Sequence, residues 1–210
     1  MDLKELLKNV ENDKLVLEKL DNQQLAFDLQ ANLNLILDEN MGLAKSLKIE
    51  SLIPYVYHIQ QAKRIFIIAA GRSGFAMRST AMRLMHLGLT VFYVGDTTTP
   101  AIEHGDLLIA ASGSGTTKSI VSAAEKAIAA GANLVAITTD IDSNLAMLAN
   151  HIVHIPAAGK QDHSKKISAQ YAGSLFEQFL LLVNDSVFQS LWKLSEKPAE
   201  ELWKKHANLE

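Results

Sequence analysis

The chain has 210 residues, 48% hydrophobic and 20% charged, which is enough for one buried core with an appended helical segment. The formal net charge of −3 and the pI near 6.2 argue against a general nucleic-acid-binding protein, which needs a basic face. The absence of cysteine excludes disulfides, thiolate zinc sites and a cysteine nucleophile, and it suits a reducing compartment.

The N-terminal stretch MDLKELLKNVENDKLVLEKL is charged and amphipathic, which distinguishes it from a signal peptide. The longest apolar runs, such as Ile65–Ala70 and Phe179–Val183, are far shorter than the roughly 20 residues that span a bilayer. We therefore expect a soluble cytoplasmic protein that has no membrane partner and no nucleic-acid partner.

Leucines recur at helical spacing from residue 2 to about residue 61, which predicts two or three amphipathic helices. Gly42 and Pro54 are the expected breaks between them. The apolar stripes have no obvious partner within one small sheet, which suggests an oligomer. We therefore divide the chain into a helical segment for packing or oligomerisation, residues 1–62, and a second domain, residues 63–210.

From residue 64 onward, short apolar runs alternate with helical patterns. The runs predict strands at 64–70, 90–94, 106–111, 133–138 and 151–155, with helices at 75–87, 120–130 and 144–149. Such an alternation indicates βαβ units, and hence an α/β fold with a doubly wound, parallel, five-stranded sheet. A long polar loop at 156–167 is a candidate functional segment. A long helix at 169–194 and a last helix that has Pro198 in its first turn complete the chain.

Two loops rich in glycine and hydroxyl groups follow strands of the predicted sheet. Residues 71–74 (GRSG) follow the first strand and residues 112–117 (SGSGTT) follow the third. Ligands of open parallel sheets bind at the carboxyl ends of strands, and backbone N–H groups, hydroxyls and a helix N-terminus together favour a phosphate. Neither loop has the spacing of a P-loop or of GxGxxG. Ordinary strand–helix turns with N-caps are the alternative interpretation.

The sequence resembles the sugar isomerase (SIS) domain family and, within it, the 6-phospho-3-hexuloisomerases. The stretches that carry the resemblance are AAGRSGFAMRSTAMRLMHLGLTVFYVGDTTTP (69–100), LLIAASGSGTTKSI (107–120), AGSLFEQFLLL (172–182) and KHANLE (205–210). The resemblance implies a flavodoxin-like fold and interconversion of D-arabino-hex-3-ulose 6-phosphate and fructose 6-phosphate in the ribulose monophosphate pathway of formaldehyde assimilation. It also implies a homotetramer that has sites near subunit contacts and needs no metal or cofactor.

By the same resemblance, Ser112, Ser114 and Thr117 hold the substrate phosphate, and Ser73 helps from the loop that begins at Gly71. Arg72 in that loop contacts the phosphate or the sugar hydroxyls, or else forms a salt bridge that holds the loop. The family usually has glutamate where this chain has Thr116, and the stretch SAQYAG departs from the family's proline-containing approach to GSLFEQ.

Moving a carbonyl from C3 to C2 needs a base that removes the C2 proton to form an enediol. Glu177, early in an apolar helix, is the candidate for this base, and its alternative is a helix-surface glutamate that the helix dipole favours. Taken alone, His206 is predicted to be an exposed tail histidine. The resemblance raises the alternative that the tail folds over an active site, which could belong to a neighbouring subunit, where His206 would act as an acid/base or assist ring opening of the product.

The other histidines do not predict a metal site. His104, His151, His154 and His163 lack a carboxylate spacing such as HExxH, and His86 is better explained by a structural or interface role. Two further functions remain open at this stage. One is another SIS-type isomerase acting on arabinose 5-phosphate or sedoheptulose 7-phosphate. The other is a non-catalytic sugar-phosphate sensor, although no basic helix-turn-helix precedes the domain.

Overall fold

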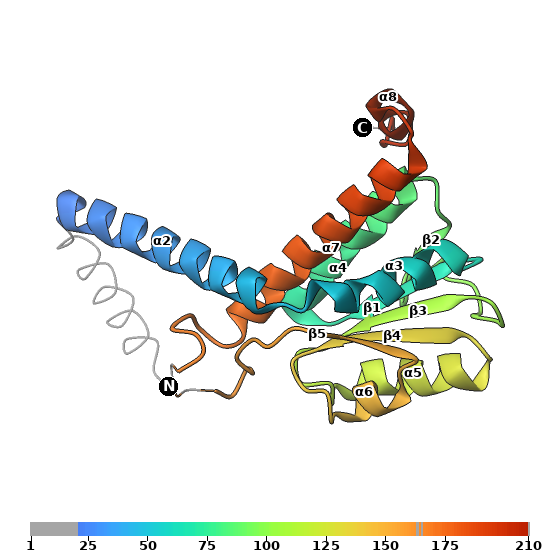
Figure 1. The fold of residues 1–210 in the computed structure, drawn as a ribbon, viewed down its shortest axis with the longest axis horizontal. Coiled ribbons are helices and arrows are strands. Elements are labelled where there is room, and N and C mark those ends of the chain that lie inside the picture. Colours follow the sequence, from blue (N-terminus) through green and yellow to red (C-terminus); the bar gives the residue numbers. More distant parts are fainter. Residues whose placement is uncertain (1–20, 163, 165, 210) are drawn as a thin grey trace, which may run out of the picture. The chain divides into compact units, whose positions relative to one another are not determined.

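A computed structural model of the chain describes residues 21–162, 164 and 166–209 (Figure 1). The chain divides into two units, residues 1–39 and residues 40–210, which are considered separately below. The part of the helical prediction that falls on residues 2–20, like His163, lies outside the described residues. The functional division at residue 62 stays a prediction.

The first described helix, α2, spans Asn22–Ser46 and runs straight through Gly42, so the predicted break at this glycine is wrong. A glycine inside a helix costs roughly 1 kcal/mol relative to alanine, which 25 residues of helix can absorb. The break comes at Leu47–Lys48, followed by a short 3₁₀ turn, η1 (Ile49–Ser51), and by α3 (Leu52–Gln61).

Pro54 lies within the first turn of α3 rather than between two helices. Proline is tolerated there because the first N–H groups of a helix have no partner within it. Tyr55 and Ile59 from the same helix are fully buried in the core against the sheet. The last helix of the predicted N-terminal segment therefore packs as part of the sheet domain.

The sheet has five parallel strands in the order β2-β1-β3-β4-β5, as predicted for the fold class. Their bounds are β1 Ile65–Ala69, β2 Val91–Tyr93, β3 Leu107–Ala111, β4 Asn133–Thr138 and β5 His151–His154. The chain leaves β1 for β2 on one side and returns to β3 on the other, so the strand order reverses between β1 and β3. In sheets of this order, ligands bind at the carboxyl ends of the strands beside that reversal.

The helices of the sheet domain are α4 Gly71–His86, α5 Lys118–Ala129, α6 Asn144–Leu148, α7 Ser174–Ser195 and α8 Ala199–Trp203. The predicted start of α4 at residue 75 is wrong, because the GRSG loop itself forms the first turn of this helix. The predicted start of α7 at residue 169 is also wrong. Ala172 (φ 43°) and Gly173 (φ 78°) adopt left-handed conformations, and two such residues in succession interrupt a right-handed helix.

Alternate residues of the central strands β1, β3 and β4 face opposite layers of helices (Figure 1). In β1, Ile65 and Ile67 pack with the layer of α3, α4 and α7, whereas Phe66 and Ile68 pack with the layer of α5 and α6. Both faces of the strands are therefore buried, which explains why they appear in the sequence as continuous apolar runs.

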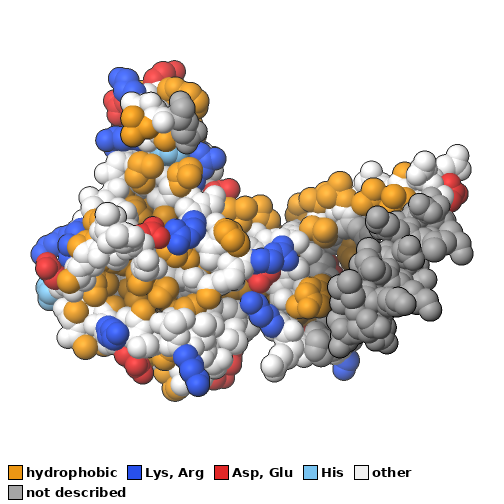
Figure 2. Space-filling model, turned by 180° about the vertical axis from the view of Figure 1, so that it is seen from behind, with side chains coloured by type: hydrophobic (Ala, Val, Ile, Leu, Met, Phe, Trp, Pro, Cys, Tyr) orange, Lys and Arg blue, Asp and Glu red, His pale blue; other side chains and the backbone are white. Residues whose placement is uncertain are grey.

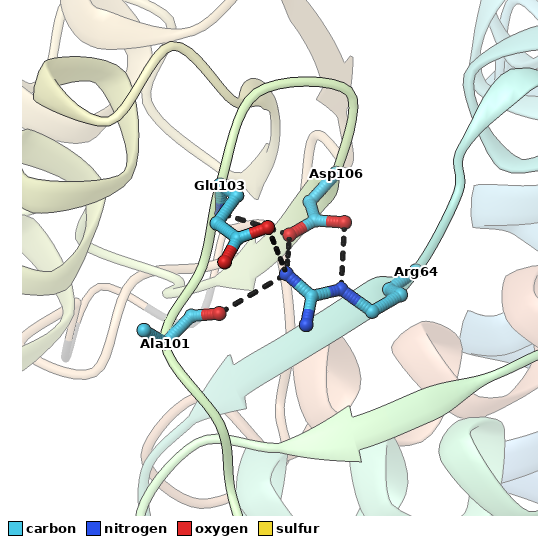
Figure 3. A network of polar contacts seen from close by, with 4 residues as sticks. All are labelled: Arg64, Ala101, Glu103 and Asp106. Atoms are coloured by element: carbon cyan, nitrogen blue, oxygen red, sulfur yellow. Dashed lines mark hydrogen bonds and ion pairs between the residues drawn. The ribbon is translucent and has the colours of Figure 1, made fainter.

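A polar network lies at the amino-terminal ends of the strands (Figure 3), opposite the carboxyl ends that carry the two loops. Arg64 donates from Nε to Asp106 Oδ1 at 3.0 Å, pairs through its terminal nitrogen with Asp106 Oδ2, and also donates to the Ala101 carbonyl at 3.1 Å. The backbone N–H of Glu103 donates to Asp106 at 2.8 Å. Asp106 is 1% exposed, so these donors stabilise a carboxylate that water does not reach.

Hydrophobic side chains remain exposed along α2 (Figure 2). The most exposed residues of this stripe are Phe27, Leu29, Leu33, Leu37 and Met41. None of the helices in the described part of the chain is both long enough and apolar enough to cross a membrane. An apolar surface of this kind marks a site of contact with another protein surface.

Candidate active site

The two loops lie side by side because the strands that precede them are neighbours in the sheet. Ala69, the last residue of β1, pairs in register with Ala111, the last residue of β3. The GRSG turn of α4 therefore begins next to the SGSGTT loop that leads into α5. The structure thus brings together the two stretches that the sequence predicted to form one site.

The SGSGTT loop is held in one shape by its own hydrogen bonds. The hydroxyls of Ser112 and Thr117 are 3.0 Å apart, and the N–H of Gly115 donates to the Ser112 carbonyl at 3.0 Å across a tight turn. Gly115 has φ +61°, a conformation that glycine adopts without steric cost. The Gly113 carbonyl accepts hydrogen bonds from the N–H and hydroxyl of Thr139, which fastens the loop to the end of β4.

Thr117 occupies the N-cap position of α5, but its side chain does not cap the helix within the described structure. The hydroxyl is directed to Ser112 instead. The first N–H groups of α5 consequently have no side-chain acceptor at the cap, and they carry the positive end of the helix dipole. Such a helix start is suited to bind an anion.

A cavity of about 190 Å³ lies between the two loops. At about 30 Å³ per water molecule, it holds the equivalent of roughly six waters, which leaves room for a phosphate group. Its described lining includes the predicted phosphate-binding residues Gly71, Ser73, Ser112, Ser114 and Thr117. Lys160 completes the lining from the polar loop after β5. Ser73 and Ser112 are buried, so their hydroxyls are held in place by the surrounding structure.

Glu177 lies in the first turn of α7 and is 6% exposed. Its carboxylate lies between two cations: Arg72 Nε is 3.3 Å from Oε2 and Lys160 Nζ is 3.6 Å from Oε1. Arg72 also donates to the Ser174 hydroxyl at 3.1 Å, and it thereby ties the GRSG turn to the start of α7. Glu177 is therefore not the exposed helix-surface glutamate that the sequence left open as an alternative.

Arg72 and Glu177 also line a second, open hollow of about 340 Å³, together with Phe75, Ser79 and Leu181. Phe75 is 75% exposed at this position. Glu177 thus lines a hollow of its own, and its ion pair with Lys160 connects it to a residue that lines the first cavity. A ligand that filled both spaces would place its anionic end among the hydroxyls and its body beside Glu177.

Comparison with known proteins shows which family the chain belongs to. The SIS domain family matches residues 58–180, which include both loops and Glu177. The chain belongs to the SIS domain family. A curated 3-hexulose-6-phosphate isomerase from Mycobacterium gastri is 55% identical over 87% of this chain and 92% of its own length. One from Bacillus subtilis is 38% identical over 83% of this chain and 95% of its own length.

Solved structures agree with this family assignment. A protein from Methanococcus jannaschii, for which a function of 3-hexulose-6-phosphate isomerase was inferred, is 33% identical to this chain, with a TM-score of 0.75. The match covers 86% of this chain and 99% of that one. The doubly wound, flavodoxin-like fold that the resemblance implied is therefore that of a SIS domain.

His206 lies elsewhere in this SIS-domain chain. Its ring stacks on His86 with centroids 4.1 Å apart and lies 4.5 Å from the Trp203 ring. His86 ends α4, whereas Arg72 lies in its first turn, so the two ends are about 22 Å apart along the helix axis. Figure 1 shows α8 beyond the far end of α7 from Glu177. Within one chain, His206 and Glu177 are not brought together.

His86, which the sequence assigned to a structural role, is 5% exposed beneath His206. Burial lowers the pKa of the His86 imidazole, and the nearby charges of His206 and Arg83 lower it further. The buried ring packs beneath the His206 ring at the end of α4.

Sequence reasoning about individual residues missed Lys160. The signal for it was the length of the polar loop 156–167, which marked the segment as functional without distinguishing its lysines. Among the described residues, no group of three or more His, Asp or Glu side chains is placed to hold a metal ion.

Proposed function

We propose that this SIS-domain protein interconverts 3-hexulose 6-phosphate (D-arabino-hex-3-ulose 6-phosphate) and fructose 6-phosphate. The observation that carries the proposal is the carboxylate of Glu177, buried between two cations next to a cavity lined with hydroxyls. The names of its curated relatives support this choice of substrate.

The phosphate group would occupy the cavity between the two loops. Hydroxyls of Ser73, Ser112, Ser114 and Thr117 and the N–H groups at the start of α5 are suited to its oxygens. The cavity fixes one end of a six-carbon chain and so determines which carbon lies beside Glu177. Positioning of this kind supplies much of the rate enhancement of an isomerase.

The proton chemistry assigned to Glu177 has two steps. The carboxylate takes the proton from C2, the bonding electrons form a C2=C3 double bond, and O3 gains a proton to give the enediol. The protonated carboxyl then returns its proton to C3 while O2 loses one, which leaves the carbonyl at C2. The guanidinium of Arg72, 3.3 Å from the carboxylate, would stabilise negative charge that develops on O2 or O3.

A proton must also be exchanged at the two oxygens, and we assign this step to His206 of a neighbouring subunit. The 22 Å or so between the ends of α4 excludes the same-chain histidine in the described arrangement. The exposed stripe on α2 supports an oligomer, as does an apolar groove of about 540 Å³ between α3 and α7. We propose a homotetramer with active sites near subunit contacts.

The proposed substrate also suggests a place for the enzyme in the cell. Sugar phosphates carry charge that does not cross a bilayer unaided, so an enzyme that uses them works in the cytoplasm. We assign the reaction to the ribulose monophosphate pathway, which runs towards formaldehyde assimilation or in reverse towards pentose supply.

The test is a coupled assay that measures fructose 6-phosphate formed from the 3-hexulose phosphate by the purified protein. We expect turnover, and we expect Glu177→Gln to lower kcat by at least about 100-fold, the scale for removal of a positioned base. Glu125→Gln on the exposed side of α5 removes the same charge elsewhere and should retain full activity. Full turnover by Glu177→Gln would disprove the assignment of the base.

The alternative functions are distinguished in the same experiment. Arabinose 5-phosphate and sedoheptulose 7-phosphate, offered in parallel, would be turned over faster if the protein were a different phosphosugar isomerase. A sugar-phosphate sensor would bind fructose 6-phosphate in a calorimetric titration and turn over none of the three substrates.

A further inference from the structure

Lys160 lines the cavity between the two loops and also forms an ion pair with the carboxylate of Glu177. It is the one charged residue among the described residues that line the cavity, and its Nζ is 3.6 Å from Glu177 Oε1. Its side chain is 62% exposed. No other described residue both lines this cavity and pairs with Glu177.

Contacts of its stem keep Lys160 at the start of α7. Gly173, at the N-cap of α7, has φ +78°, and a Cβ at this position would lie 3.0 Å from Lys160 Cγ. The missing side chain of Gly173 thus provides the space in which the lysine stem runs. The N–H of Asp162 donates to the Gly159 carbonyl at 3.0 Å, which turns the backbone around Lys160. The stem thus passes close to the start of α7, and the ammonium group at its end reaches Glu177.

The charges around Glu177 are unequal in number when the cavity is empty. Two cations, Arg72 and Lys160, are paired with one carboxylate. Both side chains are similarly exposed, but Arg72 is also tied to the Ser174 hydroxyl, whereas Lys160 carries its ammonium group on a flexible four-carbon stem. Of the two cations, Lys160 is therefore the one that can change partner without disturbing a helix.

A phosphate dianion in the cavity would compete with Glu177 for the ammonium group. It carries up to twice the charge of the carboxylate, and it would occupy a cavity whose wall already includes Lys160. Ammonium groups bind phosphate as compact point charges and need no fixed orientation to do so. A move between the two anions therefore requires only rotation about the side-chain bonds of Lys160.

We propose that Lys160 exchanges partners when substrate binds: it holds Glu177 in the empty enzyme and the phosphate of the substrate in the complex. The exchange releases one cation from the carboxylate at the moment when C2 of the sugar arrives beside it. Lys160 is thus a positioning residue that makes the readiness of the base depend on the phosphate of the substrate. This inference rests on the proposed function in that Glu177 is the base.

The experiment is a double-mutant cycle that uses inorganic phosphate as the probe. Its dissociation constant is measured by calorimetry at low salt for the full-length wild type, Lys160→Met, Glu177→Gln and the double variant. We expect Lys160→Met to weaken phosphate binding by about 10-fold, the scale of one charge-assisted contact. We expect Glu177→Gln to tighten it by about threefold, because the ammonium group loses its competing partner.

The decisive comparison is the effect of Glu177→Gln without the lysine. If the exchange operates, the tightening disappears in the Lys160→Met background. A general repulsion between Glu177 and phosphate would leave the same threefold effect in both backgrounds, and that result overturns the proposal. So does wild-type phosphate affinity in Lys160→Met.

Two matched variants keep the result interpretable. Lys126→Met, in the last turn of α5, removes the same charge away from the cavity and should bind phosphate as the wild type does. Lys160→Arg keeps the charge and should bind phosphate within about threefold of the wild type. Should Glu177→Gln fail to fold, the contrast between Lys160→Met and Lys160→Arg decides: equal affinities refute the exchange.

Turnover is measured separately, so the two proposals can fail independently. A protein that shows the full phosphate cycle but does not convert the 3-hexulose phosphate retains the exchange and loses the proposed function. A protein that converts the substrate with an additive phosphate cycle retains the function and loses the exchange. If both hold, Lys160→Met should raise KM more than it changes kcat, because the phosphate loses a contact while Glu177 no longer pairs with a lysine that has to be released.

Discussion

Gly115 is the position where the SGSGTT loop tolerates least change. Its φ is +61°, and a Cβ there would lie 1.9 Å from Ser143 Oγ and 2.3 Å from Ser143 Cβ. Ser143 caps α6, since its hydroxyl accepts from the N–H of Ala146 and donates to the Asp140 carbonyl. Gly115→Ala therefore forces either the loop or the cap of α6 to move.

The magnitude follows from three separate costs. An alanine in the left-handed conformation costs about 1–2 kcal/mol. Displacing Ser143 loses an N-cap that is worth about 1 kcal/mol. Overpacking of the buried contact adds about 1–3 kcal/mol. We expect a loss of at least about 3 kcal/mol in the free energy of unfolding, which lowers the melting temperature of a chain of this size by about 6–12 °C.

Thermal denaturation followed by circular dichroism measures this effect, and Gly71→Ala is the matched control. Gly71 has almost the same φ, +60°, but no atom lies within 4 Å of its added Cβ, so it should show the backbone cost of about 1–2 kcal/mol without the clash. Adding Ser143→Gly to Gly115→Ala should recover most of the difference, because glycine caps a helix nearly as well as serine. Equal melting temperatures for Gly115→Ala and Gly71→Ala would refute the reasoning.

Two further predictions concern the sheet edge and the subunit arrangement. Burial acts to raise the pKa of Asp106, but hydrogen bonds from Arg64 and Glu103 and the charges of Arg64 and Lys63 lower it overall below its ordinary 3.8. A carboxyl whose pKa is lowered by folding stabilises the fold above its ordinary pKa and loses this contribution as the pH falls through its folded pKa. The urea midpoints of wild type and Asp106→Asn should therefore differ at pH 7 and converge below about pH 4. Equal midpoints at pH 7 would contradict this. For the subunits, oligomers reassembled from equal amounts of Glu177→Gln and His206→Asn chains should regain about a quarter of wild-type turnover, since half of the subunit pairs contain one intact site. No recovery in confirmed hybrids would mean that both residues act from one chain.

The sheet was predictable because both of its faces are buried. Continuous apolar runs marked the central strands β1, β3 and β4, and the glycines after β1 and β3 marked the turns that follow them. Helix ends were harder to predict. The start of α7 depends on Ala172, which adopts φ +43°, and a non-glycine residue in this conformation has no signature in the sequence. Gly42 produced the opposite error, because the propensity of one residue did not stop a long helix.

The candidate site shows the same difference between features set by local sequence and features set by packing. The grouping of Ser112, Ser114 and Thr117 around one cavity could be predicted from the sequence because they lie in one loop, where spacing along the chain fixes spacing in space. Lys160 and Arg72 reach Glu177 from two other segments, and that meeting depends on how α4 and α7 pack on the same face of the sheet. Packing of this kind is set by side-chain contacts between layers, and no short motif records it. Residues that share a loop can thus be grouped from a motif, whereas contacts between distant segments become visible once the layers are assembled.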